Sequence, residues 1–377
     1  MSSNISAIVR STFLGLLICT FAIPATDLTA AAQESGPVQP PQQPEAQPQA
    51  PAPSSTAPAP ASGGAPQQSA PQQAPPGGYS ISVTVPEVNV DVVVTDNNGT
   101  YLPGLKKENF RVYEDNAPQV ITSFGPTEAP ITIVLLVEFS QLGGGFFSYN
   151  GTNWAANFLR LLRPTDWVAL EDYSLKTNID VDFTHNTDEV MQYLASMIFP
   201  PFHEADMYDA ISETIDRLRN VKGKKAILLL GTGIDTLSAL TLDKITAELK
   251  ETDVSLFFVS TAGANTFAGQ PTSMSFLQAQ NELTNFAKLT GGRAWFPNFE
   301  GEIPGIFQDV AASLRSQYSL SYVPSNQALD GKYRKIRIDL VAPDGSPMTV
   351  LDQKGKKVKM YIYARQGYVA PKSNIQN

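Results

Sequence analysis

The sequence predicts an α/β domain with a doubly wound, mostly parallel sheet. This domain is inserted into a small β-sandwich, whose strands come from the segments before and after the domain. Between residues 129 and 317, continuous apolar runs such as Ile131–Val137 alternate with helical apolar stripes, the pattern of strands buried under helices on two faces. On either side the apolar period is two, as in Val88–Val94 and Ile336–Leu340, which is typical of half-buried strands.

The two flanking segments, residues 79–128 and 318–371, are each too short to enclose a core of their own. We therefore expect them to pair into one β-sandwich. The α/β domain would then be an insertion between strands of that sandwich, which chains tolerate where the two ends of the inserted domain lie close together.

The N-terminal residues 1–32 have the pattern of a secretory signal. Arg10 provides the positive charge, Thr12–Ile23 the apolar stretch, and Ala30–Ala32 a small-residue cleavage site. An uncleaved anchor is the alternative, but the apolar run is shorter than the ~20 residues that a membrane span needs. We expect cleavage and an extracytoplasmic protein, in the periplasm, at the cell surface or secreted. The only cysteine, Cys19, would leave with the signal.

Residues 33–78 are rich in Pro, Gln, Ala and Ser, and 13 of the 29 prolines lie between Pro37 and Pro76. Such a segment has too little apolar surface to offset the entropy lost on ordering, so we expect an extended, disordered linker. The last residues, 372–377, form a short tail.

Charge and composition exclude several classes of function. A formal net charge of −9 gives no electrostatic attraction for nucleic acid. Two histidines and one cysteine leave little material for histidine catalysis, zinc or iron–sulfur sites. His203-Glu204 begins like a zinc-protease HExxH helix, but Met207 stands where the second histidine belongs. After the N-terminal segment, no stretch is apolar enough to cross a membrane, and we expect no enzyme.

Several motifs, in this order, resemble a known family. They are Gly104–Asn116, Met207–Ile211, Leu228–Leu230 followed by a glycine turn, Ser319–Pro324 and Ala364–Tyr368. The α/β block resembles a von Willebrand factor type A domain. The whole of Val88–Pro371 resembles the secreted bacterial VWFA-related proteins described in acidobacteria.

The resemblance implies a metal-ion-dependent adhesion site at the carboxyl edge of the sheet, with an Asp-x-Ser-x-Ser motif, a Thr and a second Asp. At these five positions this sequence has Glu138, Ser140, Leu142, Ala205 and Thr232. Only three of them carry a side-chain oxygen and only one is charged, whereas Mg²⁺ prefers several hard oxygen ligands. We therefore expect a vestigial site and no cofactor. The alternative is Mg²⁺ or Mn²⁺ bound with help from the neighbouring carboxylates of Glu204, Asp206 and Asp235.

The loop Leu142–Tyr149 follows the first central strand, so it belongs to the edge where open α/β sheets bind ligands. Phe146, Phe147 and Tyr149 are candidate partner-binding residues, because exposed aromatic side chains mark contact surfaces. Alternatively, the two phenylalanines pack beneath the loop.

Three functions follow from these observations. The first is an exported, non-catalytic protein-binding or adhesion module with an extracytoplasmic protein partner. The second is a structural or assembly factor of the cell envelope that uses the β-sandwich edges. The third, a metal-dependent hydrolase, has the least support in the residues.

Overall fold

The computed structural model describes residues 87–97, 99–126, 129–142, 152–198, 200–261, 273–315, 317–351 and 354–372. The predicted signal segment and linker lie outside the described residues, as do Phe146, Phe147 and Tyr149. Within the described ranges, no helix has the length and apolar character needed to cross a lipid bilayer.

The centre of the α/β region is a six-stranded sheet in the order β10-β9-β8-β5-β6-β7. Its strands are β5 (Ile131–Glu138), β6 (Trp167–Tyr173), β7 (Thr177–Thr184), β8 (Lys224–Gly231), β9 (Ser255–Ser260) and β10 (Ala294–Trp295). All neighbours pair in parallel except β7, which is antiparallel to β6 at one edge. The chain runs outward from β5 to β7, then returns to β8 on the other side of β5, so the sheet is doubly wound.

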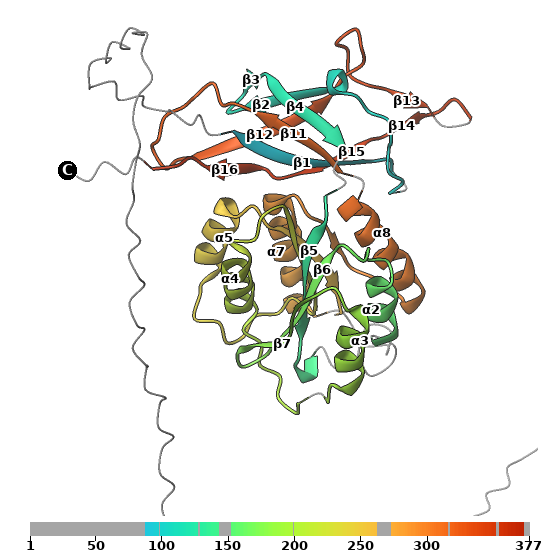
Figure 1. The fold of residues 1–377 in the computed structure, drawn as a ribbon, viewed down its shortest axis with the longest axis vertical. Helices are drawn as coiled ribbons and strands as arrows, with labels where there is room; N and C mark the ends of the chain where they lie inside the picture. Colours follow the sequence, from blue (N-terminus) through green and yellow to red (C-terminus); the bar gives the residue numbers. More distant parts are fainter. Residues whose placement is uncertain are drawn as a thin grey trace, which may run out of the picture. The chain divides into compact units, whose positions relative to one another are not determined.

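Helices cover both faces of this sheet (Figure 1). On one face lie α2 (Thr152–Leu159), α3 (Thr187–Ser196) and α8 (Ile303–Arg315); on the other lie α4 (Met207–Leu218), α5 (Leu242–Glu251) and α7 (Met274–Thr290). Each face of the sheet has its own apolar core, and alternate residues of β5 pack into one or the other. Ile133 and Leu135 pack with α2 and α8, whereas Val134 and Leu136 pack with α4 and α7. Burial on both sides explains why β5 is a continuous apolar run.

Local sequence sets several helix ends. Thr241 and Ser273 cap α5 and α7 by accepting hydrogen bonds from the backbone N–H groups of Lys244 and Phe276. Helix α7 ends at Gly291, whose φ of 79° lies in the left-handed region.

Two helices differ from the sequence-based expectation. Helix α3, which buries Val190 and Leu194, was not predicted, because a single buried pair at i and i+4 makes a weak helical pattern. The spacing of Phe158, Leu161 and Leu162 predicts a helix that continues to Pro164, but α2 ends at Leu159. There the chain tightens into i→i−3 hydrogen bonds such as Leu161 N to Phe158 O.

The segments on either side of the α/β region form two four-stranded sheets. One has the order β15-β1-β11-β4 and the other β16-β12-β2-β3. Their strands are β1 (Val88–Thr95), β2 (Phe110–Glu114), β3 (Ala117–Gln119), β4 (Ile121–Pro126), β11 (Gln317–Tyr322), β12 (Tyr333–Leu340), β15 (Tyr361–Ala364) and β16 (Gly367–Val369). Each sheet contains strands from both flanks, since β1 pairs with β11 and β15, and β2 pairs with β12. A short hairpin of β13 (Val350–Leu351) and β14 (Lys357–Val358) completes this part.

One apolar core joins the two four-stranded sheets. Val90 and Val92 of β1 and Leu320 of β11 pack with Phe110 of β2 and Ile338 of β12. The two flanks therefore bury their apolar faces together, as neither is able to do alone.

Candidate functional site

The candidate site lies at the carboxyl ends of β5 and β8. Between these neighbouring strands the chain order reverses, and open α/β sheets bind ligands in the crevice outside the strand ends at such a switch point. Glu138 is the last residue of β5, and Thr232 directly follows β8. We call this edge the crest; among the described residues it comprises 139–142, 174–176, 197–198, 200–206, 232–241 and 273–277.

The Glu138 carboxylate is fully buried and both of its oxygens accept hydrogen bonds. Oε1 accepts from the hydroxyl of Ser140 at 2.7 Å. Oε2 accepts from the backbone N–H of Thr232 at 2.5 Å and from its hydroxyl at 2.7 Å. Burial raises the pKa of Glu138, and the bonds from Ser140 and Thr232 oppose that shift. The extra methylene of glutamate, compared with aspartate, lets the carboxylate reach β8.

Gly231 makes this approach sterically feasible. A Cβ atom at this position would lie 2.5 Å from the Tyr173 hydroxyl and 2.9 Å from the Glu138 Cβ. The Tyr173 ring is fully buried, and burial together with the nearby Glu138 carboxylate raises its pKa well above the usual value. The floor of the crest is therefore packed with protein side chains.

Leu142 and Ala205, the two remaining positions of the predicted vestigial site, carry no side-chain oxygen. Their hydrogen bonds are made by backbone groups. The N–H of Leu142 donates to the Ser140 hydroxyl at 3.2 Å. Ala205 is buried; its N–H donates to the Thr236 hydroxyl at 2.8 Å and its carbonyl accepts from the N–H groups of Thr236 and Leu237. The Ala205 bonds connect the loop after α3 with the loop after β8, whereas the Leu142 bond lies within the loop after β5.

The neighbouring carboxylates do not converge on one point. Asp235 accepts from the N–H of Tyr208 and the hydroxyl of Ser238, while Glu204 is exposed. Asp206 is 6% exposed, and burial, with repulsion from nearby carboxylates, raises its pKa to about 6. Among the residues that the structure describes, no group of three or more His, Cys, Asp or Glu side chains is arranged to hold a metal ion.

Large apolar side chains are exposed around the crest, a feature that the sequence analysis missed. We call the set the apolar rim: Leu175, Ile198, Leu237, Met274 and Leu277. Ile198 and Met274 are 86% and 79% exposed, respectively. They come from the β6–β7 turn, the α3–α4 connection, the segment after β8 and the first turn of α7. The signal that would have revealed them is an apolar residue in a connection at the carboxyl edge.

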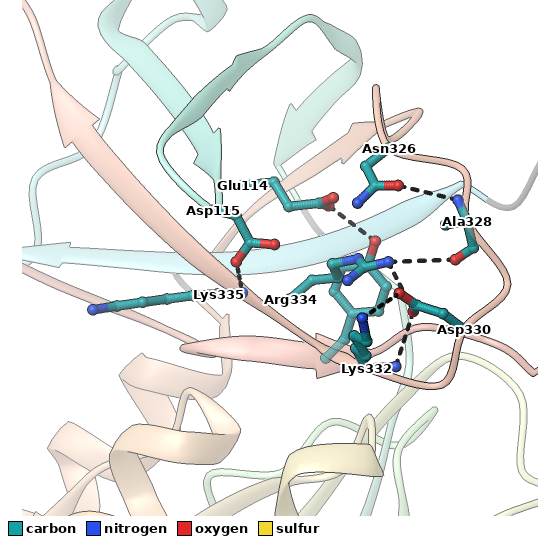
Figure 2. Close-up of polar contacts among 9 residues, drawn as sticks. Glu114, Asp115, Asn326, Ala328, Asp330, Lys332, Arg334 and Lys335 are labelled. Carbon is teal, nitrogen blue, oxygen red and sulfur yellow. Dashed lines mark hydrogen bonds and ion pairs between the residues drawn. The ribbon is translucent and has the colours of Figure 1, made fainter.

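A second polar cluster lies in the flanking sheets. Oε2 of the buried Glu114 accepts hydrogen bonds from the hydroxyls of Tyr322 and Tyr368, each at 2.9 Å. Figure 2 shows the nearby Arg334 guanidinium bound to Asp330, at 2.8 Å. The charged groups here face donors or opposite charges, and the bonds connect β11 of one sheet with β2 and β16 of the other. We interpret this cluster as a structural connection between the sheets.

Comparisons with known proteins give fold-level similarity only. No protein-family model matches the sequence, and no curated protein matches it. An aerotolerance-related membrane protein from Bacteroides fragilis is 10% identical, with 49% of this chain and 98% of that chain covered and a TM-score of 0.39. BatB from Bacteroides thetaiotaomicron is 12% identical over 50% of this chain and 100% of that chain, with a TM-score of 0.37.

The vWF domain of the type V pili tip protein Mfa5 from Porphyromonas gingivalis is 10% identical. The match covers 50% of this chain and 96% of that one, with a TM-score of 0.38. At such identities and TM-scores the similarities assign neither a family nor a function.

Proposed function

We propose that this chain is an exported, non-catalytic protein-binding or adhesion module of the von Willebrand factor A type, which contacts a protein partner through its crest without a metal ion. The observation that carries the proposal is the state of the Glu138 carboxylate. A metal-dependent adhesion site needs carboxylate and hydroxyl oxygens that are free to ligate a cation. Here three protein donors engage both oxygens of the only carboxylate among the five site positions.

The apolar rim supplies the contact surface in place of a cation. Exposed apolar side chains in one region of a protein favour contact with another protein, because binding removes them from water. Ile198 and Met274 are the most exposed members of the rim and the natural anchors for such a contact.

The signal segment, the linker and the flanking sheets each have a part in the proposed function. The signal segment would direct the chain out of the cytoplasm, and the linker would act as a tether. The two flanking sheets would form a β-sandwich into which the α/β domain is inserted.

Variants at matched exposed positions test where the partner binds. The full chain is immobilised and offered the solubilised envelope fraction and medium of the source organism. We expect Ile198→Ser with Met274→Ser to weaken capture of a specific partner by about tenfold or more. Val120→Ser is the matched control, since Val120 is 80% exposed but lies between β3 and β4, at the edges of the flanking sheets.

The opposite result would favour the envelope-assembly function. If Val120→Ser abolished capture while the crest variant bound normally, the sandwich edges and not the crest would be the contact surface. Circular dichroism of each variant establishes that the fold is retained.

A calorimetric titration of the native chain with Mg²⁺, Mn²⁺ and Ca²⁺ tests the metal-free part of the proposal. We expect no saturable heat. Saturable binding that Glu138→Gln abolishes would overturn it and return the mechanism to cation-bridged capture of an acidic side chain, or to metal-dependent hydrolysis.

A further inference from the structure

A polar cavity of about 380 Å³ lies at the opposite edge of the six-stranded sheet from the crest. Lys224 and Lys225 at the start of β8 and Asp253 just before β9 line one side. Asp91 of β1 and Arg365 after β15 line the other. Segments distant in the sequence therefore meet around one space, a common position for small-ligand sites.

The charges that line the cavity do not balance. Lys225 is paired with Asp253, with 2.7 Å between Nζ and Oδ1. Three cations and two carboxylates face the cavity, so one positive charge has no counterpart. This excess of positive charge occurs in a chain whose formal net charge is −9.

Arg365 and Lys224 are the cations without a carboxylate in hydrogen-bond contact. Arg365 donates from Nε to the carbonyl of Gly367 at 2.8 Å, and Lys224 donates to the carbonyl of Leu314 at 2.8 Å. That bond uses Nε of Arg365, so the two terminal nitrogens of Arg365 take no part in it. A guanidinium offers these nitrogens as a planar fork that fits a carboxylate or phosphate.

Burial disfavours the charged forms of the Arg365 and Lys224 side chains. It lowers the pKa of the Arg365 guanidinium, a shift that Asp253 partly opposes. It also lowers the pKa of the Lys224 ammonium to about 8, a shift that Asp91 partly opposes. A partly desolvated cation without a paired anion destabilises the protein, and an anion bound beside it relieves that cost.

We propose that this cavity binds a small oxyanion, a carboxylate or a phosphate, held by the forked guanidinium of Arg365 and by the ammonium of Lys224. The volume is within the range of small-molecule sites and too small for a folded partner. The hydroxyls of Ser319 and Thr252, which also line the cavity, supply neutral hydrogen-bond donors. A bound anion would join the amino end of β8 to the segment after β15.

The test measures anion binding to the full chain at constant ionic strength, with inorganic phosphate and citrate as separate probes against a chloride background. We expect a saturable rise in the melting temperature, and a matching calorimetric isotherm, with at least one of the probes. Phosphate alone, citrate alone or both would each identify the preferred oxyanion class. No saturable binding of either probe to the native chain would overturn the proposal.

Variants locate the site. Arg365→Gln is expected to weaken binding about tenfold or more, because a charge-assisted, forked pair is lost. Arg365→Lys, which keeps the charge but not the fork, should weaken binding less and guards against a folding defect in the first variant. Lys332→Gln is the control, since Lys332 is an exposed cation of the flanking sheets that does not line the cavity. Equal affinity of the native chain and Arg365→Gln would show that the anion binds elsewhere and overturn the assignment.

Discussion

Oε2 of Glu138 accepts two hydrogen bonds from one residue, Thr232: from the backbone N–H at 2.5 Å and from the hydroxyl at 2.7 Å. These bonds join the carboxyl ends of β5 and β8 at the switch point of the sheet. In doubly wound folds this place normally receives a ligand. Here a carboxylate of the protein itself makes the contacts.

The bond between Thr232 and Glu138 should contribute measurably to stability. Thr232→Ala removes the hydroxyl and leaves Oε2 with one donor instead of two, in a fully buried site. We expect the free energy of unfolding to fall by about 1–3 kcal/mol. Urea unfolding at neutral pH measures it.

Thr232→Ser is the matched control for this prediction, because it keeps the hydroxyl while removing a methyl group. It should retain most of the native stability. If the serine and alanine variants were equally destabilised, the loss would come from packing and not from the hydrogen bond to Glu138.

The ionisation of Asp166 should account for part of the decrease in the free energy of unfolding at acidic pH. Burial disfavours its charge, but hydrogen bonds from the Arg315 guanidinium and from the N–H groups of Arg163 and Ile131 outweigh burial and lower its pKa. Because the folded-state pKa is below the unfolded value of ~3.9, its stabilisation is present above that value and is lost as the pH falls through the folded pKa.

Asp166→Asn is therefore expected to cost about 3 kcal/mol at neutral pH, where Arg315 loses its buried partner, and to make stability less dependent on pH below ~4. Urea unfolding between acidic and neutral pH measures both effects. Asp216→Asn serves as the control, since Asp216 pairs with Arg219 on the surface. Native-like acid sensitivity in Asp166→Asn would contradict the prediction.

The ionisation of two tyrosines of the flanking sheets, Tyr322 and Tyr368, should lower the free energy of unfolding at alkaline pH. Burial and the hydrogen bond to Glu114 raise the pKa of Tyr322 and of Tyr368. Since a raised folded-state pKa favours the protonated hydroxyl, the stabilisation is complete below the unfolded value of ~10 and is lost as the pH rises above it.

We expect the free energy of unfolding to decrease above pH ~10, with the part of the tyrosinate absorbance that comes from these buried hydroxyls appearing together with unfolding. Tyr368→Phe should reduce that pH dependence, because it removes one such hydroxyl. Tyrosinate absorbance that titrates fully while the protein remains folded would show that these hydroxyls are accessible and refute the prediction.

Much of the α/β region was predictable because buried strands and amphipathic helices leave strong patterns. Ile131–Val137, for example, indicated β5. Helix α3 escaped prediction because only Val190 and Leu194 are buried. The oxygen content of the five site positions was also readable from the sequence, but the partners of those oxygens were not.

The sequence alone determined which residue types stand at the crest and that the flanking segments have strand periodicity, since both are properties of local order along the chain. Only the tertiary structure decided that Glu138 reaches Thr232, that Ile198 and Met274 are exposed, and that Arg365 meets Lys224 across a cavity. These relationships depend on the distance and solvation of groups far apart in the sequence. Such properties arise only when the sheets and helices pack together.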